Sequence, residues 1–244
     1  MSIIFAHRGS AGTHPENTMA AYIEAEKVGA EGLEIDVHYT KDNQLAVIHD
    51  DTVNRTTNGK GMVRDNTLAE LRKLDAGSWF SPNFQQEKIP TLEEVLEFIQ
   101  NNNMILNIEL KYVALDYVDF EKKIIQLIEA YDLVDRVIIS SFNHEGLKKV
   151  NELHPKIECG ALYMERLYEP WHYVKTFGAT AIHSYVKTTD ATMIQRATEN
   201  DIDVRVFTVN QTEQLHYFIQ ANCPAIITDY PEKALDIRKT IKGK

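Results

Sequence analysis

Two short stretches carry charged side chains at every second position. Glu34 and Asp36 alternate with apolar residues in LEIDV, and Glu109 and Lys111 do the same in NIELK. Residues two apart in a strand project from one face, so each pair would lie side by side. If the strands are buried, their carboxylates need cationic partners or a metal ion, because an uncompensated buried charge is costly. Oxygen ligands of this kind suit Mg²⁺, Ca²⁺ or Mn²⁺, whereas zinc usually recruits histidine or cysteine.

Two histidines and an arginine stand close to these acids in the pattern. His7 ends the apolar run IIFAH and is followed by Arg8, and His49 ends the run QLAVIHD. Two imidazoles that flank one reacting group can act as a general acid and a general base near neutral pH. Arg8 and Lys111 offer a planar fork and a mobile point charge, which are the groups that bind phosphoryl oxygens. Taken singly, His7 is more typical of a hydrogen-bonded core histidine, and Arg8 could simply form an ion pair with an acid.

The elements that must position these residues alternate along the chain. Apolar, β-rich runs predict strands at 3–7, 33–37, 105–111, 136–142, 158–163, 180–185, 204–210 and 225–229. Helical patterns lie between or after them, at 18–29, 91–102, 116–132, 144–154, 169–178, 188–200, 212–223 and 231–243. Eight strands with helical crossovers favour a TIM (β/α)8 barrel over a doubly wound sheet, and HRGSAG lacks the dinucleotide-binding glycine pattern. Strands covered by helices are buried on both faces, which argues against a solvated face for the acids.

One segment interrupts the alternation. QLAVIHD follows LEIDVHYT after only a few turn residues, a link too short for a parallel crossover, so this run must return antiparallel. We therefore expect a single domain over 1–244, with an insertion at about 38–90 between the second barrel strand and its helix. Thr91 and Glu94 have capping-box spacing after Pro90 and mark the start of that helix. NGKG within the insertion lacks the spacing of a phosphate-binding P-loop.

Composition limits the possible partners and the compartment. The 244 residues are 43% hydrophobic, as in an ordinary globular protein. Their formal charge of −10 disfavours a nucleic-acid partner. The two cysteines, Cys159 and Cys223, form neither a metal motif nor a disulfide framework, which fits a reducing cytoplasm. MSIIFAHRG has neither the pattern of a signal peptide nor that of a spanning helix. We expect a cytoplasmic protein that does not insert into membranes, with a homodimer left open.

Short motifs in unbroken order along nearly the whole chain resemble the glycerophosphodiester phosphodiesterase family. They are AHRG, PENT, EIDVHYTKD, VIHD, RTTNGKG, LDAGSWF, IELK, FTVN and ITDYP. The resemblance implies a TIM barrel with a small insertion, and metal-dependent hydrolysis of glycerophosphodiesters such as glycerophosphocholine and glycerophosphoethanolamine to sn-glycerol 3-phosphate and an alcohol. It departs at Phe207, where the family commonly has tryptophan, and this change would affect the pocket wall and the alcohol accepted.

The resemblance also implies roles for particular residues. Glu34, Asp36 and Glu109 look like ligands of one divalent cation, Mg²⁺, Ca²⁺ or Mn²⁺. His7 and His49 look like the acid–base pair, with His49 as the acid by family analogy. Arg8 and Lys111 look like phosphate contacts. The nucleophile is either water or the glycerol 2-hydroxyl of the substrate.

Other residues carry weaker indications. Asn17 either contacts substrate or caps the helix ahead of Met19, and Trp79 and Phe80 either roof the cleft or form the small core of the insertion. A group near other strand ends either lines the pocket or packs in the core, and a group of histidines is expected at the surface or at caps. The first group is Tyr163, His183 and Tyr185; the second is His14, His38, His144, His154, His172 and His216.

Rival functions are a lysophospholipase D or sphingomyelinase D type activity on intact lipids, an enolase-type lyase or isomerase, and a silent binding protein. The first lacks an evident membrane-docking segment, the second has no need of a His-Arg pair at the first strand, and the third conflicts with the presence of both histidines.

Overall fold

A computed structural model describes residues 1–112 and 117–242. In this part of the chain, eight parallel strands pair in a closed ring, because β1 bonds to both β2 and β9. The ring strands are β1 (Ile3–His7), β2 (Gly32–Tyr39), β4 (Ile105–Leu110), β5 (Val137–Ser141), β6 (Glu158–Tyr163), β7 (Ala181–Tyr185), β8 (Asp203–Phe207) and β9 (Ala225–Thr228). The TIM barrel expected from the sequence is confirmed.

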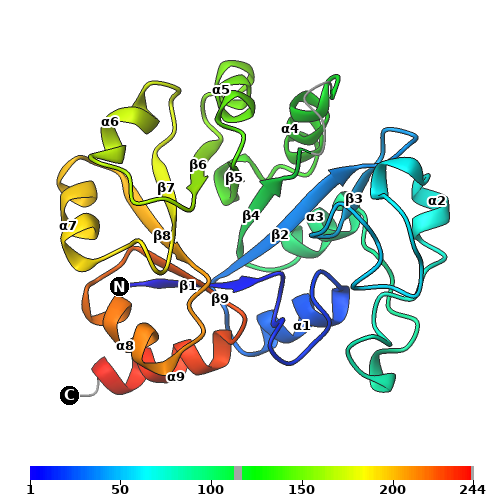
Figure 1. Ribbon diagram of the computed structural model, residues 1–244, viewed down its shortest axis with the longest axis horizontal. Coiled ribbons are helices and arrows are strands. Elements are labelled where there is room, and N and C mark those ends of the chain that lie inside the picture. The colour runs from blue at the N-terminus through cyan, green and yellow to red at the C-terminus, as the bar shows by residue number, and fades with distance from the viewer. Residues whose placement is uncertain (113–116, 243–244) are drawn as a thin grey trace.

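Helices surround this ring and connect its strands (Figure 1). They are α1 (Met19–Lys27), α3 (Leu92–Gln100), α4 (Phe120–Ala130), α5 (His144–Leu153), α6 (Pro170–Lys175), α7 (Ala191–Glu199), α8 (Thr212–Gln220) and α9 (Pro231–Lys242), and a 3₁₀ turn, η3 (Val134–Arg136), precedes β5. All of the helical patterns correspond to helices, although residue 116 of one and residue 243 of another lie outside the described residues. α3 begins after Thr91, which forms the predicted capping box with Glu94. Within the described residues, no helix is both long and apolar enough to cross a membrane.

The insertion lies between β2 and α3, beside the barrel (Figure 1). It contains β3 (Leu45–Val47), η1 (Val63–Asp65), α2 (Leu68–Leu71) and η2 (Pro82–Phe84). β3 pairs antiparallel with the end of β2, as the short link requires, so it extends the sheet outside the closed ring. The insertion has an apolar cluster of its own, made by Ala46, Ile48, Val53, Val63, Leu71, Ala76 and Ile89.

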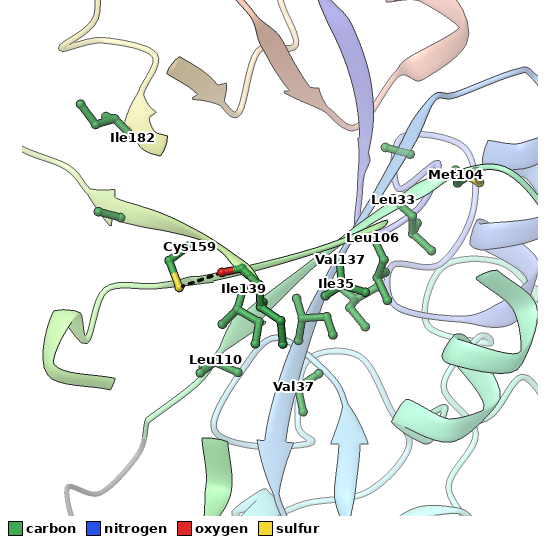
Figure 2. Packing of buried hydrophobic residues seen from close by; sticks show 14 of the residues in the cluster. Leu33, Ile35, Val37, Met104, Leu106, Leu110, Val137, Ile139, Cys159 and Ile182 are labelled. Atoms are coloured by element: carbon green, nitrogen blue, oxygen red, sulfur yellow. Dashed lines mark hydrogen bonds between the residues drawn. The ribbon is translucent and has the colours of Figure 1, made fainter. Parts of the chain in front are cut away.

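Successive side chains along each strand point alternately toward the surrounding helices and into the barrel. Figure 2 shows Leu33, Ile35 and Val37 of β2 near Leu106 and Leu110 of β4, and these side chains belong to the large cluster between the strands and the helices. The residues between them therefore point into the barrel.

The side chains inside the barrel change from apolar to polar toward the C-terminal ends of the strands. Phe5, Ile138 and Ile227 form an apolar cluster in the interior, and two residues further along each chain segment stand His7, Ser140 and Asp229. The interior is thus apolar at depth and polar at the C-terminal mouth, where TIM barrels place their active sites.

Candidate active site

Three carboxylates converge at the mouth from two adjacent strands. β2 and β4 are hydrogen-bonded neighbours, and their register places Asp36 beside Glu109 and Glu34 beside Asn107. One carboxylate oxygen from each of Glu34, Asp36 and Glu109 lies within 4.8 Å of the other two. All three side chains are buried. The two acidic stretches therefore form one cluster, as their spacing and the predicted burial suggested.

Two basic side chains lie against this cluster. Lys111 Nζ is 3.0 Å from Asp36 Oδ1 and 2.5 Å from Glu109 Oε1. Arg8 Nε is 3.3 Å from Asp36 Oδ2, and the Arg8 backbone N–H donates to Glu34 Oε2 over 3.0 Å. Burial alone would raise the pKa of Asp36, but Lys111 and Arg8 hold that pKa far below its usual range.

The other two acids differ from Asp36. Burial, together with the charges of Asp36 and Glu109, raises the pKa of Glu34 well above its ordinary value. Burial also raises the pKa of Glu109 to about 7, although Lys111 opposes the shift. The cluster thus favours additional positive charge, whether protons or a cation.

The donor set fits a hard divalent cation. The cluster offers only carboxylate oxygens, and Asp36 Oδ1 accepts no hydrogen bond within the described residues, although it lies in the ion pair with Lys111. Such oxygens match the preference of Mg²⁺, Ca²⁺ and Mn²⁺.

His7 is oriented by an aspartate that the sequence did not single out. His7 Nδ1 lies 2.6 Å from Asp229 Oδ1, and because a carboxylate only accepts, Nδ1 is the donor. Asn210 Nδ2 donates to Asp229 Oδ2, and the Asp229 backbone N–H donates to Asn210 Oδ1. His7 Nε2 lies 4.0 Å from Glu34 Oε2. The ring therefore turns Nε2 toward the acidic cluster.

His49 is held in a similar way by the residue that follows it. His49 Nδ1 donates to Asp50 Oδ1 over 2.8 Å, and the His49 carbonyl oxygen lies 3.0 Å from His38 Nε2. Burial lowers the pKa of His49, with Lys111 and Arg8 acting in the same direction against Asp36. His38 was expected at the surface, but it is fully buried, and its contact with the His49 backbone accounts for the difference.

A chain of ion pairs connects the two halves of the site. Glu16 Oε1 accepts from Arg8 Nη1 over 2.8 Å and from Arg55 Nη2 over 2.8 Å, and Arg55 Nη1 donates to Glu16 Oε2. Arg55 Nε also donates to Asp50 Oδ2 over 2.8 Å. Arg8 is thereby linked to His49 through Glu16, Arg55 and Asp50. The only sequence signal for Arg55 and Glu16 is that they stand in the motifs RTTNGKG and PENT.

Asn17 lies in the site but does not cap α1. The cap is Thr18, whose side chain accepts from the Ala21 backbone N–H. Asn17 has φ 52°, a left-handed conformation that asparagine tolerates. Its amide donates to Asp36 Oδ2 over 2.8 Å and accepts from the Tyr22 hydroxyl over 3.0 Å. Both ends of the buried side chain are thus engaged with protein groups.

The remaining weaker candidates separate into two groups. Trp79 and Phe80 are exposed and lie outside the apolar cluster of the insertion, so of the two alternatives left open for them, a place in its small core is wrong. Tyr163 and His183 are buried, as a packing role requires, and His183 also lines a small cavity together with Glu34 and Phe207.

Comparisons with known proteins agree on one family. The sequence model of the glycerophosphoryl diester phosphodiesterase family matches residues 7–233. A glycerophosphodiester phosphodiesterase of Caldanaerobacter subterraneus subsp. tengcongensis is 42% identical over 97% of each chain. One from Bacillus altitudinis is 41% identical over 99% of this chain and 100% of its own. A phosphodiesterase of Oleispira antarctica, solved in complex with the product sn-glycerol-3-phosphate, superposes with a TM-score of 0.88 at 31% identity, covering 97% of this chain and 96% of its own.

Proposed function

The chain belongs to the glycerophosphoryl diester phosphodiesterase family, and from this premise we propose that it hydrolyses glycerophosphodiesters such as glycerophosphocholine and glycerophosphoethanolamine to sn-glycerol 3-phosphate and an alcohol. The activity of a glycerophosphodiester phosphodiesterase follows from the family and from relatives of that name. The observation that carries the catalytic proposal is the buried cluster of Glu34, Asp36 and Glu109, with His7 Nε2 next to it.

Glu34, Asp36 and Glu109 would hold one divalent cation, Mg²⁺, Ca²⁺ or Mn²⁺. When bound, such a cation supplies Lewis-acid polarisation of a phosphate oxygen. Arg8 and Lys111 bind the remaining phosphate charge, since both are cationic and both lie beside the cluster, within ion-pair distance of Asp36. Asn17 orients Asp36 through its amide instead of reaching the substrate, because both of its polar atoms already have protein partners.

Both imidazoles donate Nδ1–H to a carboxylate, which leaves each Nε2 free to exchange a proton with the substrate. We assign His7 as the base that deprotonates the nucleophile and His49 as the acid that protonates the leaving alkoxide. Each transfer contributes roughly 10²–10⁴ in rate. The nucleophile is water or the glycerol 2-hydroxyl, and phosphorus NMR during turnover separates them because only the second passes through a cyclic phosphate.

A panel of glycerophosphodiesters tests the proposal. The purified chain is assayed for release of sn-glycerol 3-phosphate with a chelator present and after Mg²⁺, Ca²⁺ or Mn²⁺ is restored singly. Activity should vanish with chelator and return with at least one ion. His7→Ala and His49→Ala should each lose most of the activity, while His172→Ala on the exposed side of α6 should retain it. Full turnover by His49→Ala would remove the basis of the scheme.

The comparisons do not favour cleavage of intact lipids, because the similar relatives are named for glycerophosphodiesters. The ratio of rates on glycerophosphocholine and lysophosphatidylcholine measures this directly. We further propose that residues 1–244 act as one catalytic domain in the cytoplasm, where the buried free thiols of Cys159 and Cys223 would stay reduced. A homodimer remains a prediction, and sedimentation measurements of the oligomeric state would test it.

A further inference from the structure

A small cavity in the barrel is lined in part by the carboxylate cluster itself. His7, Glu34 and Glu109 form the side next to the cluster, and Asn107, His183 and Phe207 form part of the remaining wall. The cavity is therefore continuous with the groups to which we assign the reaction. It has room for a water molecule or a group of similar size, but not for a longer chain.

Asn107, which lines this cavity, has an unused acceptor. Its Nδ2 donates to Ser140 Oγ over 3.0 Å, which leaves Oδ1 as the free end of the amide. Oδ1 has no hydrogen-bond partner in the part of the chain that the structure describes, and the side chain is 1% exposed. Leaving a buried polar atom without a partner is energetically unfavourable, so a ligand or water is expected there.

His183, which lines the same cavity, has an unused donor. Its Nε2 lies 3.3 Å from Arg205 Nη1, and because a guanidinium only donates, Nε2 is the acceptor. Burial and the charge of Arg205 hold the pKa of His183 well below its ordinary value, so the ring is neutral and its proton is on Nδ1. Nδ1 makes no hydrogen bond within the described residues, and the side chain is fully buried.

The ring of His183 is also fixed in place. A Cβ built on Gly160 would lie 2.3 Å from His183 Nε2, so the imidazole packs directly on the backbone of β6. Arg205, on its other side, is anchored by Glu158. Packing and this ion pair therefore hold the ring in one position at the wall of the cavity.

One buried acceptor and one buried donor together match a hydroxyl group, which donates one hydrogen bond and accepts others. We propose that the cavity receives the terminal hydroxyl of the substrate's glycerol, which donates to Asn107 Oδ1 and accepts from His183 Nδ1–H. The proposal rests on the proposed hydrolysis of glycerophosphodiesters. It makes Asn107 and His183 specificity residues that require a free terminal hydroxyl.

This assignment predicts a preference for deacylated substrates. In a 1-acyl lysophospholipid an ester replaces the terminal hydroxyl, so the acyl chain cannot enter the cavity and the buried pair stays unpaired. A site built to bond a substrate hydroxyl discriminates strongly against analogues that lack it, because its own polar groups are then left unsatisfied. The site would thus select free glycerophosphodiesters over lipids without a separate barrier at the mouth.

The test compares glycerophosphocholine with the phosphocholine diester of propane-1,2-diol, which lacks only the terminal hydroxyl. The wild-type chain should prefer the glycerol substrate by at least about tenfold in kcat/KM, which corresponds to one buried hydrogen bond. Asn107→Leu should lose most of this preference through its effect on the glycerol substrate. Asn103→Leu is the matched control, because it makes the same substitution at an exposed asparagine outside the cavity, and it should keep the preference.

A second measurement is independent of turnover and of the fold of any variant. Calorimetry on the wild-type chain compares the affinity of sn-glycerol 3-phosphate with that of the matching propanediol phosphate, and a crystal structure with the former locates its hydroxyl. Equal affinities, or a water in the cavity with the glycerol outside it, would overturn the proposal. If neither diester is hydrolysed but the binding preference holds, the proposed reaction fails and the hydroxyl site stands.

Discussion

Arg55 of the insertion and Glu16 of the loop between β1 and α1 form a two-pronged ion pair, with Arg55 Nη1 2.6 Å from Glu16 Oε2 and Nη2 2.8 Å from Glu16 Oε1. The same guanidinium bonds to Asp50, which orients His49, and Glu16 also bonds to Arg8. The ion pair therefore joins the segment that carries one proposed phosphate ligand to the segment that carries one proposed catalytic histidine. Bidentate arginine–carboxylate pairs of this kind fix the relative orientation of the two side chains as well as pairing their charges.

Arg55→Met should lower kcat/KM by about tenfold to a hundredfold, because charge-assisted hydrogen bonds contribute about 1.5–3 kcal/mol. Glu16→Gln should act through the same contact, so the double variant should lose less than the sum of the two effects. Steady-state kinetics of the wild type, the two single variants and the double variant on a glycerophosphodiester measures this coupling. Arg64→Met, at another exposed arginine of the insertion, is the control and should be neutral. Additive losses would show that the two residues act separately.

Asp229→Ala should lower kcat while leaving KM nearly unchanged. Without the carboxylate, His7 loses the 2.6 Å contact that fixes which nitrogen carries its proton and which way the ring points. Loss of one charge-assisted hydrogen bond corresponds to roughly a tenfold to hundredfold fall in rate. Asp229→Glu should recover part of the rate, and Asp236→Ala on the surface of α9 should cost little. A change confined to KM would contradict a positioning role.

The strands and helices were predictable because their periodicity is local, but the contacts of the site depend on which strands are neighbours. LEIDV and NIELK each indicate a charged face, yet only the β2–β4 register brings Asp36 beside Glu109. Asp229 stands at a strand end before the proline that opens α9, where an aspartate is just as typical of a helix start. Its contact with His7, 222 residues away in sequence, has no local signal.

His38 shows the corresponding limit for burial. Period-2 alternation places His38 on the same side as Glu34 and Asp36, but it does not say what covers that side. The loop after β3 does so here, because the His49 carbonyl lies against the His38 ring. Arg55 is a similar case. A charged residue in a turn-rich segment is usually solvated, and only the folded insertion places Arg55 against Glu16.

Lys111→Met should destabilise the cation-free protein and reduce hydrolysis. Lys111 lies between Asp36 and Glu109, and loss of one partner of a buried ion pair costs about 3–5 kcal/mol, part of which protonation of the carboxylates offsets. Thermal unfolding with chelator should show a lowered Tm, and saturating Mg²⁺ or Ca²⁺ should narrow the gap to the wild type. Lys148→Met, which removes one partner of an exposed ion pair with Glu152, should change Tm little. A gap of equal size with and without cation would contradict this account.

Cation binding should release protons near neutral pH. The pKa of Glu34 is well above its usual value and that of Glu109 is about 7, so in the cation-free site these carboxyls are at least partly protonated at pH 6, whereas coordination needs the ionised form. The affinity of the site for the cation should therefore rise with pH while these groups lose their protons, and it should level off once both are ionised. Titration calorimetry in buffers of different ionisation enthalpy should give about one to two protons released per cation at pH 6, and fewer at pH 8. Glu109→Gln, which cannot ionise, should release about one proton fewer. Heats that do not depend on the buffer would mean that the acids are already ionised before the cation binds.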